Sequence, residues 1–191
     1  MITDKIRQDI MAKCEKYMRT ADVGRVFDFW TEHISLVVKH AVRLAKEYGA
    51  DVEIVELGAL LHDVAKIDRV GEQADHHIKG ADIAIEMLRK YNYDETKTNR
   101  VEDCVINHRS SLNANTIEET CVADADALAH FDNPFKIAQF VYGILGKEKA
   151  EGREELRKYF EKDFNTLSAR TQKSFKPRFD TIMDVLFGGM K

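Results

Sequence analysis

Apolar residues recur three and four positions apart along most of the chain, which places them on one face of an α-helix. No segment shows the strict alternation of apolar and polar residues that is typical of a half-buried β-strand. The chain contains only two prolines, which would interrupt helices, and it is rich in the good helix formers Ala, Glu, Lys and Leu. The pattern therefore predicts an all-α protein.

The same periodicity predicts where the helices lie. Gly49 follows one apolar stripe and is expected to end that helix. Asp51 and Asp75 each stand immediately before a new stripe, where an N-cap is expected, and Pro134 should stop the helix before it. The expected helices span residues 3–19, 30–48, 52–66, 76–91, 96–108, 117–131, 135–146, 149–162 and 168–187.

Length and composition favour one soluble domain. The chain has 191 residues, of which 44% are hydrophobic and 32% are charged, enough for a sizeable core. We expect a single domain over residues 1–191. The three cysteines are odd in number and far apart, so we expect them to be reduced and buried in a cytoplasmic protein.

Charge and hydropathy narrow the class of partner. No apolar run reaches the ~18 residues of a membrane span, and the N-terminus lacks a signal-peptide core, so no membrane partner is expected. The net charge of −4 gives no general attraction to long nucleic acid. A small anionic substrate remains compatible, because a bound metal can supply local positive charge. The sequence leaves open a homo-oligomer.

Several polar side chains fall on faces that the apolar pattern predicts to be buried. His33 continues an apolar stripe, His62 and Asp63 interrupt the run ALLHDVAKID, and His108 closes a further stripe. Burying such groups is costly unless something binds them. Two explanations are open: a network of histidine–aspartate hydrogen bonds, or a divalent cation such as Mn, Fe, Co, Ni or Zn, which imidazole and carboxylate ligands suit. Five helices carry such groups, and that number favours the metal.

Periodicity does not choose between neighbouring candidates on two of these helices. His76 and His77 each align with a different apolar stripe, and so do Asp124 and Asp126.

These residues resemble the motifs of the HD domain, a helical superfamily of metal-dependent phosphohydrolases. The resemblance covers residues 28 to 132 and consists of a histidine, an adjacent His-Asp pair and a distant aspartate in "ADAL". It implies a helical bundle with this motif core, on which an N-terminal helix (1–20) and C-terminal helices (133–191) pack. It also implies a metal site formed by His33, His62, Asp63 and Asp126.

Some members of the superfamily bind two metals through two further histidines. The first of these stands four residues before a Gly-Ala pair, and "HHIKGA" matches with His76 rather than His77. The second matches His108 in "VINHR". The resemblance thus implies one or two divalent ions (Mn, Fe, Co, Ni, Mg or Zn), with Asp63 as the bridge. The alternative is that His76 and His108 position substrate phosphate beside a single ion.

One position departs from part of the superfamily. Deoxynucleotide monophosphatase-like members carry a glutamate three residues after the motif aspartate, where this chain has Lys66. This departure argues against deoxynucleotide monophosphatase activity. The His-Asp pair followed by Lys66 resembles instead the phosphodiesterase and dinucleoside-polyphosphate branches of the superfamily. We expect Asp63 and Lys66 to be catalytic, with Lys66, His77 and Arg109 binding substrate. His40 and His130 are expected to be structural.

The resemblance implies hydrolysis of a phosphate ester or anhydride by metal-activated water, with a small phosphate compound, above all a nucleotide, as substrate. Two other classes stay open at this stage. One is a regulatory module that binds metal and ligand without turnover, and the other is an HD-type diiron oxygenase, because the same ligands serve oxygen chemistry.

Overall fold

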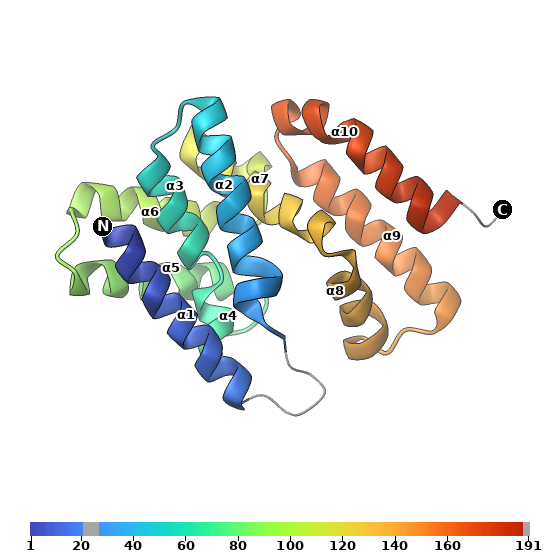
Figure 1. Ribbon diagram of the computed structural model, residues 1–191, viewed down its shortest axis with the longest axis horizontal. Coiled ribbons are helices and arrows are strands. Elements are labelled where there is room, and N and C mark those ends of the chain that lie inside the picture. The colour runs from blue at the N-terminus through green and yellow to red at the C-terminus, as the bar shows by residue number, and fades with distance from the viewer. Residues whose placement is uncertain (21–26, 189–191) are drawn as a thin grey trace.

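The computed structural model describes residues 1–20 and 27–188, and within these ranges it contains helices and loops but no β-strand (Figure 1). The all-α prediction is confirmed. The elements are α1 (Ile2–Thr20), η1 (Trp30–Ile34), α2 (Ser35–Tyr48), α3 (Val52–Leu61), α4 (Val64–Asp68), α5 (His76–Lys90), α6 (Glu95–Asn107), η2 (Ser111–Asn113), α7 (Ile117–Asp132), α8 (Pro134–Gln139), η3 (Phe140–Ile144), α9 (Lys149–Thr166), α10 (Ala169–Met183) and η4 (Asp184–Gly188).

Helix α3 lies at the centre of the N-terminal helices and packs against α1, α2, α5, α6 and α7. Asp51 caps its N-terminus as predicted, because the carboxylate accepts hydrogen bonds from the backbone N–H groups of Glu53 and Ile54. Gly58 allows the close approach to α6, since a Cβ at this position would lie 2.8 Å from the Cβ of Cys104. Helix α3 therefore delivers the residues that follow it to the interior of the bundle.

The helix predicted over residues 52–66 is broken, and this prediction was wrong in one important respect. Helix α3 ends at Leu61 and α4 begins at Val64, with a turn at His62 and Asp63 between them. Adjacent side chains on a straight helix point about 100° apart. The turn frees His62 and Asp63 from that constraint, so both can reach one point.

Other boundaries differ by smaller amounts. The helix expected over 30–48 is continuous but opens as the π-helical η1, and the helix expected over 135–146 divides into α8 and η3. Pro134 occupies the first turn of α8, where its missing N–H has no cost. Asp75 does precede α5, but its carboxylate accepts a hydrogen bond from the Glu72 N–H (2.6 Å) instead of capping the helix.

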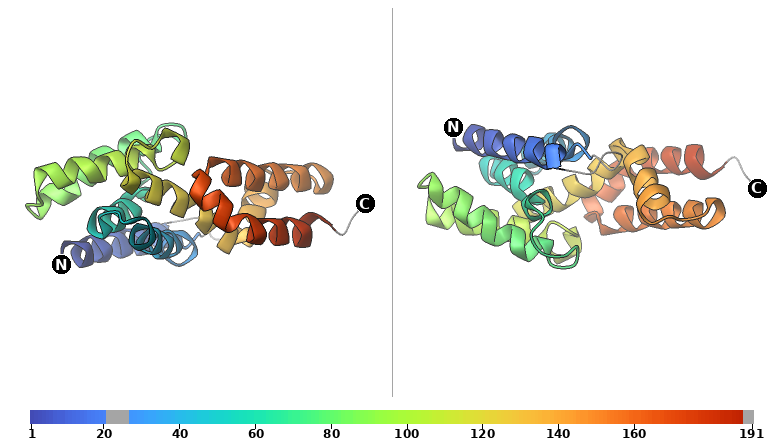
Figure 2. Two further views of the ribbon diagram at one scale, coloured as in Figure 1. Left: turned by 90° about the horizontal axis from the view of Figure 1, so that it is seen from above. Right: turned by 90° about the horizontal axis from the view of Figure 1, so that it is seen from below.

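Helices α8, α9 and α10 form a C-terminal group. It lies beside the N-terminal group, α1 to α6, along the long axis of the molecule (Figures 1 and 2). Helix α7 joins the groups, because it packs against α2, α3 and α6 and also against α8, α9 and α10. Phe131 of α7 contacts Phe160 and Phe175 with ring centroids 5.3 and 5.0 Å apart. One hydrophobic cluster includes buried residues of both groups. That continuity favours a single domain, which stays a prediction.

A buried carboxylate on α7 anchors the C-terminal helices. The Asp124 side chain is fully buried and accepts hydrogen bonds from the Ser168 N–H (2.8 Å) and from the Ser168 (2.6 Å), Thr171 and Ser111 hydroxyls. Ser168 is the N-cap of α10. Asp124 therefore fixes the start of α10 against α7.

Replacing Asp124 with asparagine is expected to lower the free energy of unfolding by about 2–4 kcal/mol, because the amide N–H₂ cannot accept these bonds and leaves buried donors unpaired. Urea denaturation measures the change. The control is Asp180→Asn, because Asp180 is an exposed carboxylate of α10 that pairs only with Lys176 on the same helix. A stability change in Asp124→Asn no larger than that of the control would contradict the anchor.

Candidate metal centre

The structure brings together the six side chains predicted to bind metal. They come from five segments that are far apart in sequence, and five of the six are buried, while the Asp126 side chain is 16% exposed. They are His33 from η1, His62 and Asp63 from the turn between α3 and α4, His76 from the start of α5, His108 after the end of α6, and Asp126 from α7.

Four of these side chains form a first group. The Nε2 atoms of His33 and His62 are 3.1 Å apart. Asp63 Oδ2 lies 3.5 Å from His33 Nε2 and 3.7 Å from His62 Nε2. Asp126 Oδ1 lies 3.3 Å and 3.7 Å from the same two nitrogens. Two imidazole nitrogens and two carboxylate oxygens thus face one point.

The other oxygen of Asp63 belongs to a second group. Asp63 Oδ1 lies 3.5 Å from His76 Nε2 and 3.7 Å from His108 Nε2. The two nitrogens are themselves 3.1 Å apart. Asp63 therefore gives one oxygen to each group, which is the geometry of a bridging carboxylate.

The hydrogen bonds of three histidines fix which ring nitrogen carries the proton. In His62, His76 and His108, Nδ1 lies 2.7–2.8 Å from the backbone carbonyl oxygen three residues earlier. A carbonyl only accepts, so Nδ1 holds the proton and Nε2 of the neutral ring carries a lone pair. Burial favours the neutral form of His108 and His76, because it lowers the pKa of His108 to about 3 and that of His76 below its usual value.

The facing nitrogens of His76 and His108 therefore favour a bound cation. Two neutral Nε2 lone pairs at 3.1 Å repel each other, whereas neighbouring ligands of one ion at about 2.1 Å lie roughly 3.0 Å apart. The buried Asp126 Oδ1 accepts no hydrogen bond from any residue that the structure describes, and Asp63 Oδ1 accepts none either, although the Lys66 ammonium lies 2.9 Å from it. The donors present thus fit divalent metal better than a hydrogen-bonded network.

The carboxylates are ionised, as metal ligands must be. Burial alone would raise the pKa of Asp63, but the nearby Lys66 ammonium is the largest of the opposing effects, which together hold the pKa well below the usual value. Burial would also raise the pKa of Asp126. The neighbouring His33 is the largest of the opposing effects, which together hold that pKa well below the usual value.

Comparison with known proteins agrees with this geometry. Residues 30–130, more than half of the chain, match the family model described as the HD domain. The chain belongs to the HD domain family. His33, the His62–Asp63 pair and Asp126 all lie within the matched range.

Two curated relatives match part of this chain within much longer chains of their own. Ribonuclease Y of Treponema pallidum is 34% identical over 128 residues, which are 67% of this chain and 23% of the relative. The tRNA (cytidine(56)-2'-O)-methyltransferase of Thermoplasma volcanium is 32% identical over 143 residues, which are 69% of this chain and 40% of the relative. The chain therefore spans less than half the length of either relative.

A solved structure extends the likeness to the C-terminal helices. Bacillus subtilis YpgQ, crystallised in complex with ADP, superposes with a TM-score of 0.66 over 97% of this chain and 94% of its own, at 17% identity. At this identity the match shows a common fold. It includes the helices that follow the HD motif core.

Lys66 stands beside the HD pair and lines a cavity. Its ammonium lies 2.9 Å from Asp63 Oδ1 and 3.0 Å from Asp63 Oδ2, and it donates a hydrogen bond to Oδ2. A cavity of about 280 Å³ is lined by Lys66, His76, Arg69, Tyr17 and other residues of the segment from Phe29 to Gln73. An anion in this cavity would meet Lys66 and Arg69 beside the second group.

The structure does not bring His77, Arg109 or Asp124 into the HD centre. His77 lies next to His76 but joins neither ligand group. Arg109 is exposed and donates a hydrogen bond to the Ala74 carbonyl (3.2 Å). Asp124 anchors α10, so geometry favours Asp126 over Asp124 and His76 over His77. That His77 and Arg109 bind substrate stays a prediction.

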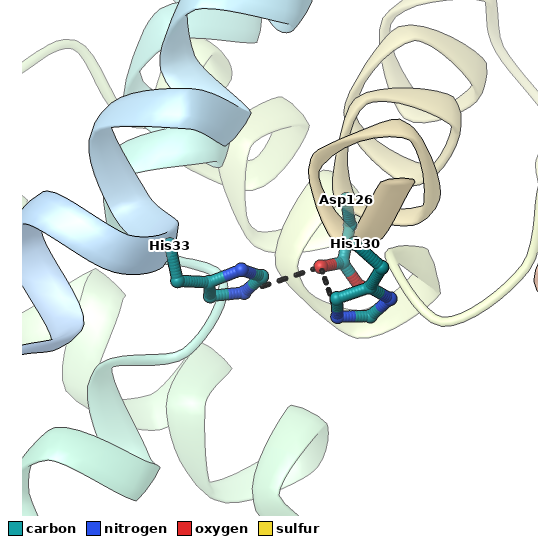
Figure 3. A group of neighbouring side chains, drawn as sticks. All are labelled: His33, Asp126 and His130. Carbon is teal, nitrogen blue, oxygen red and sulfur yellow. Dashed lines mark ion pairs between the residues drawn. The ribbon is translucent and has the colours of Figure 1, made fainter. Parts of the chain in front are cut away.

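Sequence reasoning missed two basic residues near the HD centre. His130, expected to be structural, points toward Asp126 and His33 (Figure 3). Burial lowers the pKa of Lys136, on α8, to about 8. Asp63 and Asp126 act against burial and raise that pKa, so Lys136 lies near both carboxylates. The spacing of four between Asp126 and His130, one helical turn, was the available signal for His130.

Among the described residues, no helix has the length and hydropathy needed to cross a membrane.

Proposed function

We propose that the protein is a metal-dependent phosphohydrolase that acts on a phosphate ester or anhydride, with a nucleotide as substrate. The observation that carries the proposal is the pair of ligand groups that share Asp63. The second group offers only three protein ligands, so an ion bound there would keep positions open for water and substrate. Imidazoles mixed with carboxylates favour Mn, Co, Ni, Zn or Fe over Mg.

Each residue has a role in this proposal. A divalent ion, when bound, would lower the pKa of water to the neutral range and offset charge on phosphoryl oxygens. Asp63 holds the two groups in register through its two oxygens. Lys66 donates to a phosphate oxygen from the cavity side of Asp63, and Arg69 adds a second cation at the cavity wall. The neutral imidazoles keep their Nε2 lone pairs directed at the centre.

Support for a small nucleotide comes from three observations. The cavity has a volume of about 280 Å³, and the net charge of −4 gives no general attraction to long nucleic acid. The structural relative YpgQ was crystallised with ADP. Ribonuclease Y, a relative by sequence, acts on RNA by its name, so an RNA oligonucleotide belongs in the substrate panel.

The test is an assay of protein loaded with Mn²⁺, Co²⁺, Ni²⁺, Zn²⁺, Fe²⁺ or Mg²⁺. The panel contains nucleoside mono-, di- and triphosphates, cyclic nucleotides, dinucleoside polyphosphates and single-stranded RNA. Hydrolysis of a nucleotide supports the proposal. Binding without turnover across the panel would indicate a regulatory module instead, and oxygen consumption with iron bound but no hydrolysis would indicate an oxygenase.

Lys66→Ala is expected to lower kcat by about 10²–10³-fold, because it removes a charged donor aimed at the phosphoryl group. The metal content should stay at the wild-type level, since Lys66 offers no lone pair to an ion. Steady-state kinetics and metal analysis measure the two quantities. Lys39→Ala, which removes an exposed lysine of α2, is the control. Equal kcat values for Lys66→Ala and the control would remove Lys66 from the mechanism.

A further inference from the structure

His130 lies at the edge of the first ligand group, outside the six predicted ligands. It follows Asp126 by one turn of α7, and its Nε2 is 3.8 Å from Asp126 Oδ1. One ligand atom each from His33, Asp126 and His130 lie within 4.8 Å of one another. Figure 3 shows the Asp126 carboxylate between the two imidazole rings.

A carboxylate from a different helix holds the His130 ring. Nδ1 of His130 lies 2.8 Å from Oδ2 of Asp163 on α9. The ring stacks on His33 with centroids 5.3 Å apart and planes 7° apart, and it meets Tyr159 edge-on at 5.7 Å. Because an ionised carboxylate only accepts, Nδ1 donates and Nε2 is left to face Asp126. Metal-binding histidines commonly have this arrangement, in which the other ring nitrogen donates to a carboxylate.

A hydrogen bond to Asp126 does not account for this orientation. The distance of 3.8 Å from Nε2 to Oδ1 is too long for one, and Asp126 Oδ1 has no hydrogen-bond partner among residues 1–20 and 27–188. Two ligands of one ion at about 2.1 Å can stand up to roughly 4.2 Å apart. The distances of 3.3 Å and 3.8 Å from Asp126 Oδ1 to His33 and His130 both lie within that limit.

We propose that His130 is a fifth protein ligand of the ion bound by His33, His62, Asp63 and Asp126, and that Asp163 positions its ring. The inference rests on the metal centre of the proposed function, but not on the reaction. Five protein ligands would leave one position of an octahedral shell, whereas Asp63, His76 and His108 leave three. The first ion is then the tightly held one, and the second, beside the cavity and Lys66, is the one that exchanges water and substrate.

The chain contains a matched control. His40 of α2 and Asp132 of α7 form a second histidine–aspartate pair with Nε2 and Oδ2 2.7 Å apart. The side chains of the two pairs are similarly buried, at 11% and 17% exposed for His40 and Asp132 against 14% and 13% for His130 and Asp163. In the part of the chain that the structure describes, three clusters could hold an ion, and His40 belongs to none of them.

The experiment is a titration of metal-free protein with Co²⁺, whose visible spectrum reports the ligands around the ion. His130→Ala is expected to change the spectrum of the first equivalent bound and to raise its Kd more than 10-fold. Asp163→Asn should raise the Kd by roughly 10–100-fold while His130 remains present. His40→Ala should leave the spectrum and the Kd unchanged. Asp163→Asn provides an independent arm if His130→Ala folds poorly.

A wild-type spectrum and Kd in both His130→Ala and Asp163→Asn would overturn the inference, and a loss of turnover in those proteins would then assign His130 to the substrate. Failure of the proposed function looks different: the wild type would bind Co²⁺ with a spectrum that depends on His130 but would hydrolyse nothing in the panel. A wild type that binds no Co²⁺ would reject both.

Discussion

Asp63→Ala protein is expected to lose metal from both ligand groups and to hydrolyse its substrate more than about 10³-fold more slowly than the wild type. Within residues 1–20 and 27–188, Asp63 is the one side chain that faces all four of His33, His62, His76 and His108. Its removal takes an anionic oxygen from each group. Changes that only reorient a ligand already cost 10–100-fold in affinity or activity, so the loss of a bridge should cost more.

Metal analysis of protein purified without chelator, together with initial rates at saturating Mn²⁺ or Co²⁺, measures both effects. Asp68→Ala is the control, because Asp68 is a carboxylate of the neighbouring helix α4 that pairs with Lys13 outside the centre. Wild-type metal content in Asp63→Ala would show that the ion, if any, binds elsewhere.

Removing the metal with a chelator is expected to lower the Tm by roughly 5–10 °C. An ion present at 100 times its Kd contributes about 2.7 kcal/mol to folding, and each kcal/mol is worth about 2–4 °C in a chain of this size. The physical source is the repulsion that the ion relieves between the Nε2 lone pairs of His76 and His108, and between the carboxylates of Asp63 and Asp126. Differential scanning calorimetry with and without chelator, followed by restoration with Mn²⁺ or Co²⁺, checks the prediction.

Acid should destabilise the metal-free protein on its own. Burial lowers the pKa of His33 to about 4 and that of His108 to about 3, against 6.5 for an ordinary histidine. As the pH falls below 6.5, the unfolded chain takes up protons that the folded chain does not, so the free energy of unfolding decreases. His33→Gln in metal-free protein should flatten this pH dependence. In the chelation experiment described above, done at a pH above 6.5 so that this acid effect is absent, an unchanged Tm would contradict a resident metal.

The sequence predicts which face of each helix is buried. It does not predict where the side chains of different helices come together. His33 and His108 fall on apolar stripes, so their burial followed from periodicity. The turn at His62 and Asp63 left no signal, because the run ALLHDVAKID contains neither glycine nor proline. After the turn, α4 packs against α5 and α1, and such tertiary contacts are not visible in the local sequence.

Neighbouring candidates on α7 show the same limit. Asp124 and Asp126 both lie on inward faces, and periodicity left them equal because the helix is covered on two sides. Only the packing of α10 assigns Asp124 to Ser168 and Thr171. The partner of His130 is Asp163, 33 residues later on α9, and no local pattern specifies a contact at that separation.

Helix α7 has a consequence for how sequence changes far from the centre should act. Over seven residues it holds Asp124 against α10 on one side and turns Asp126 and His130 toward the ligands on another. Any free energy that docking of α9 and α10 contributes to ion affinity must, by thermodynamic reciprocity, be returned by the ion as tighter docking. Substitutions in α9 or α10 that weaken docking would then lower the affinity for the ion. They would do so while every ligand of the ion stays the same.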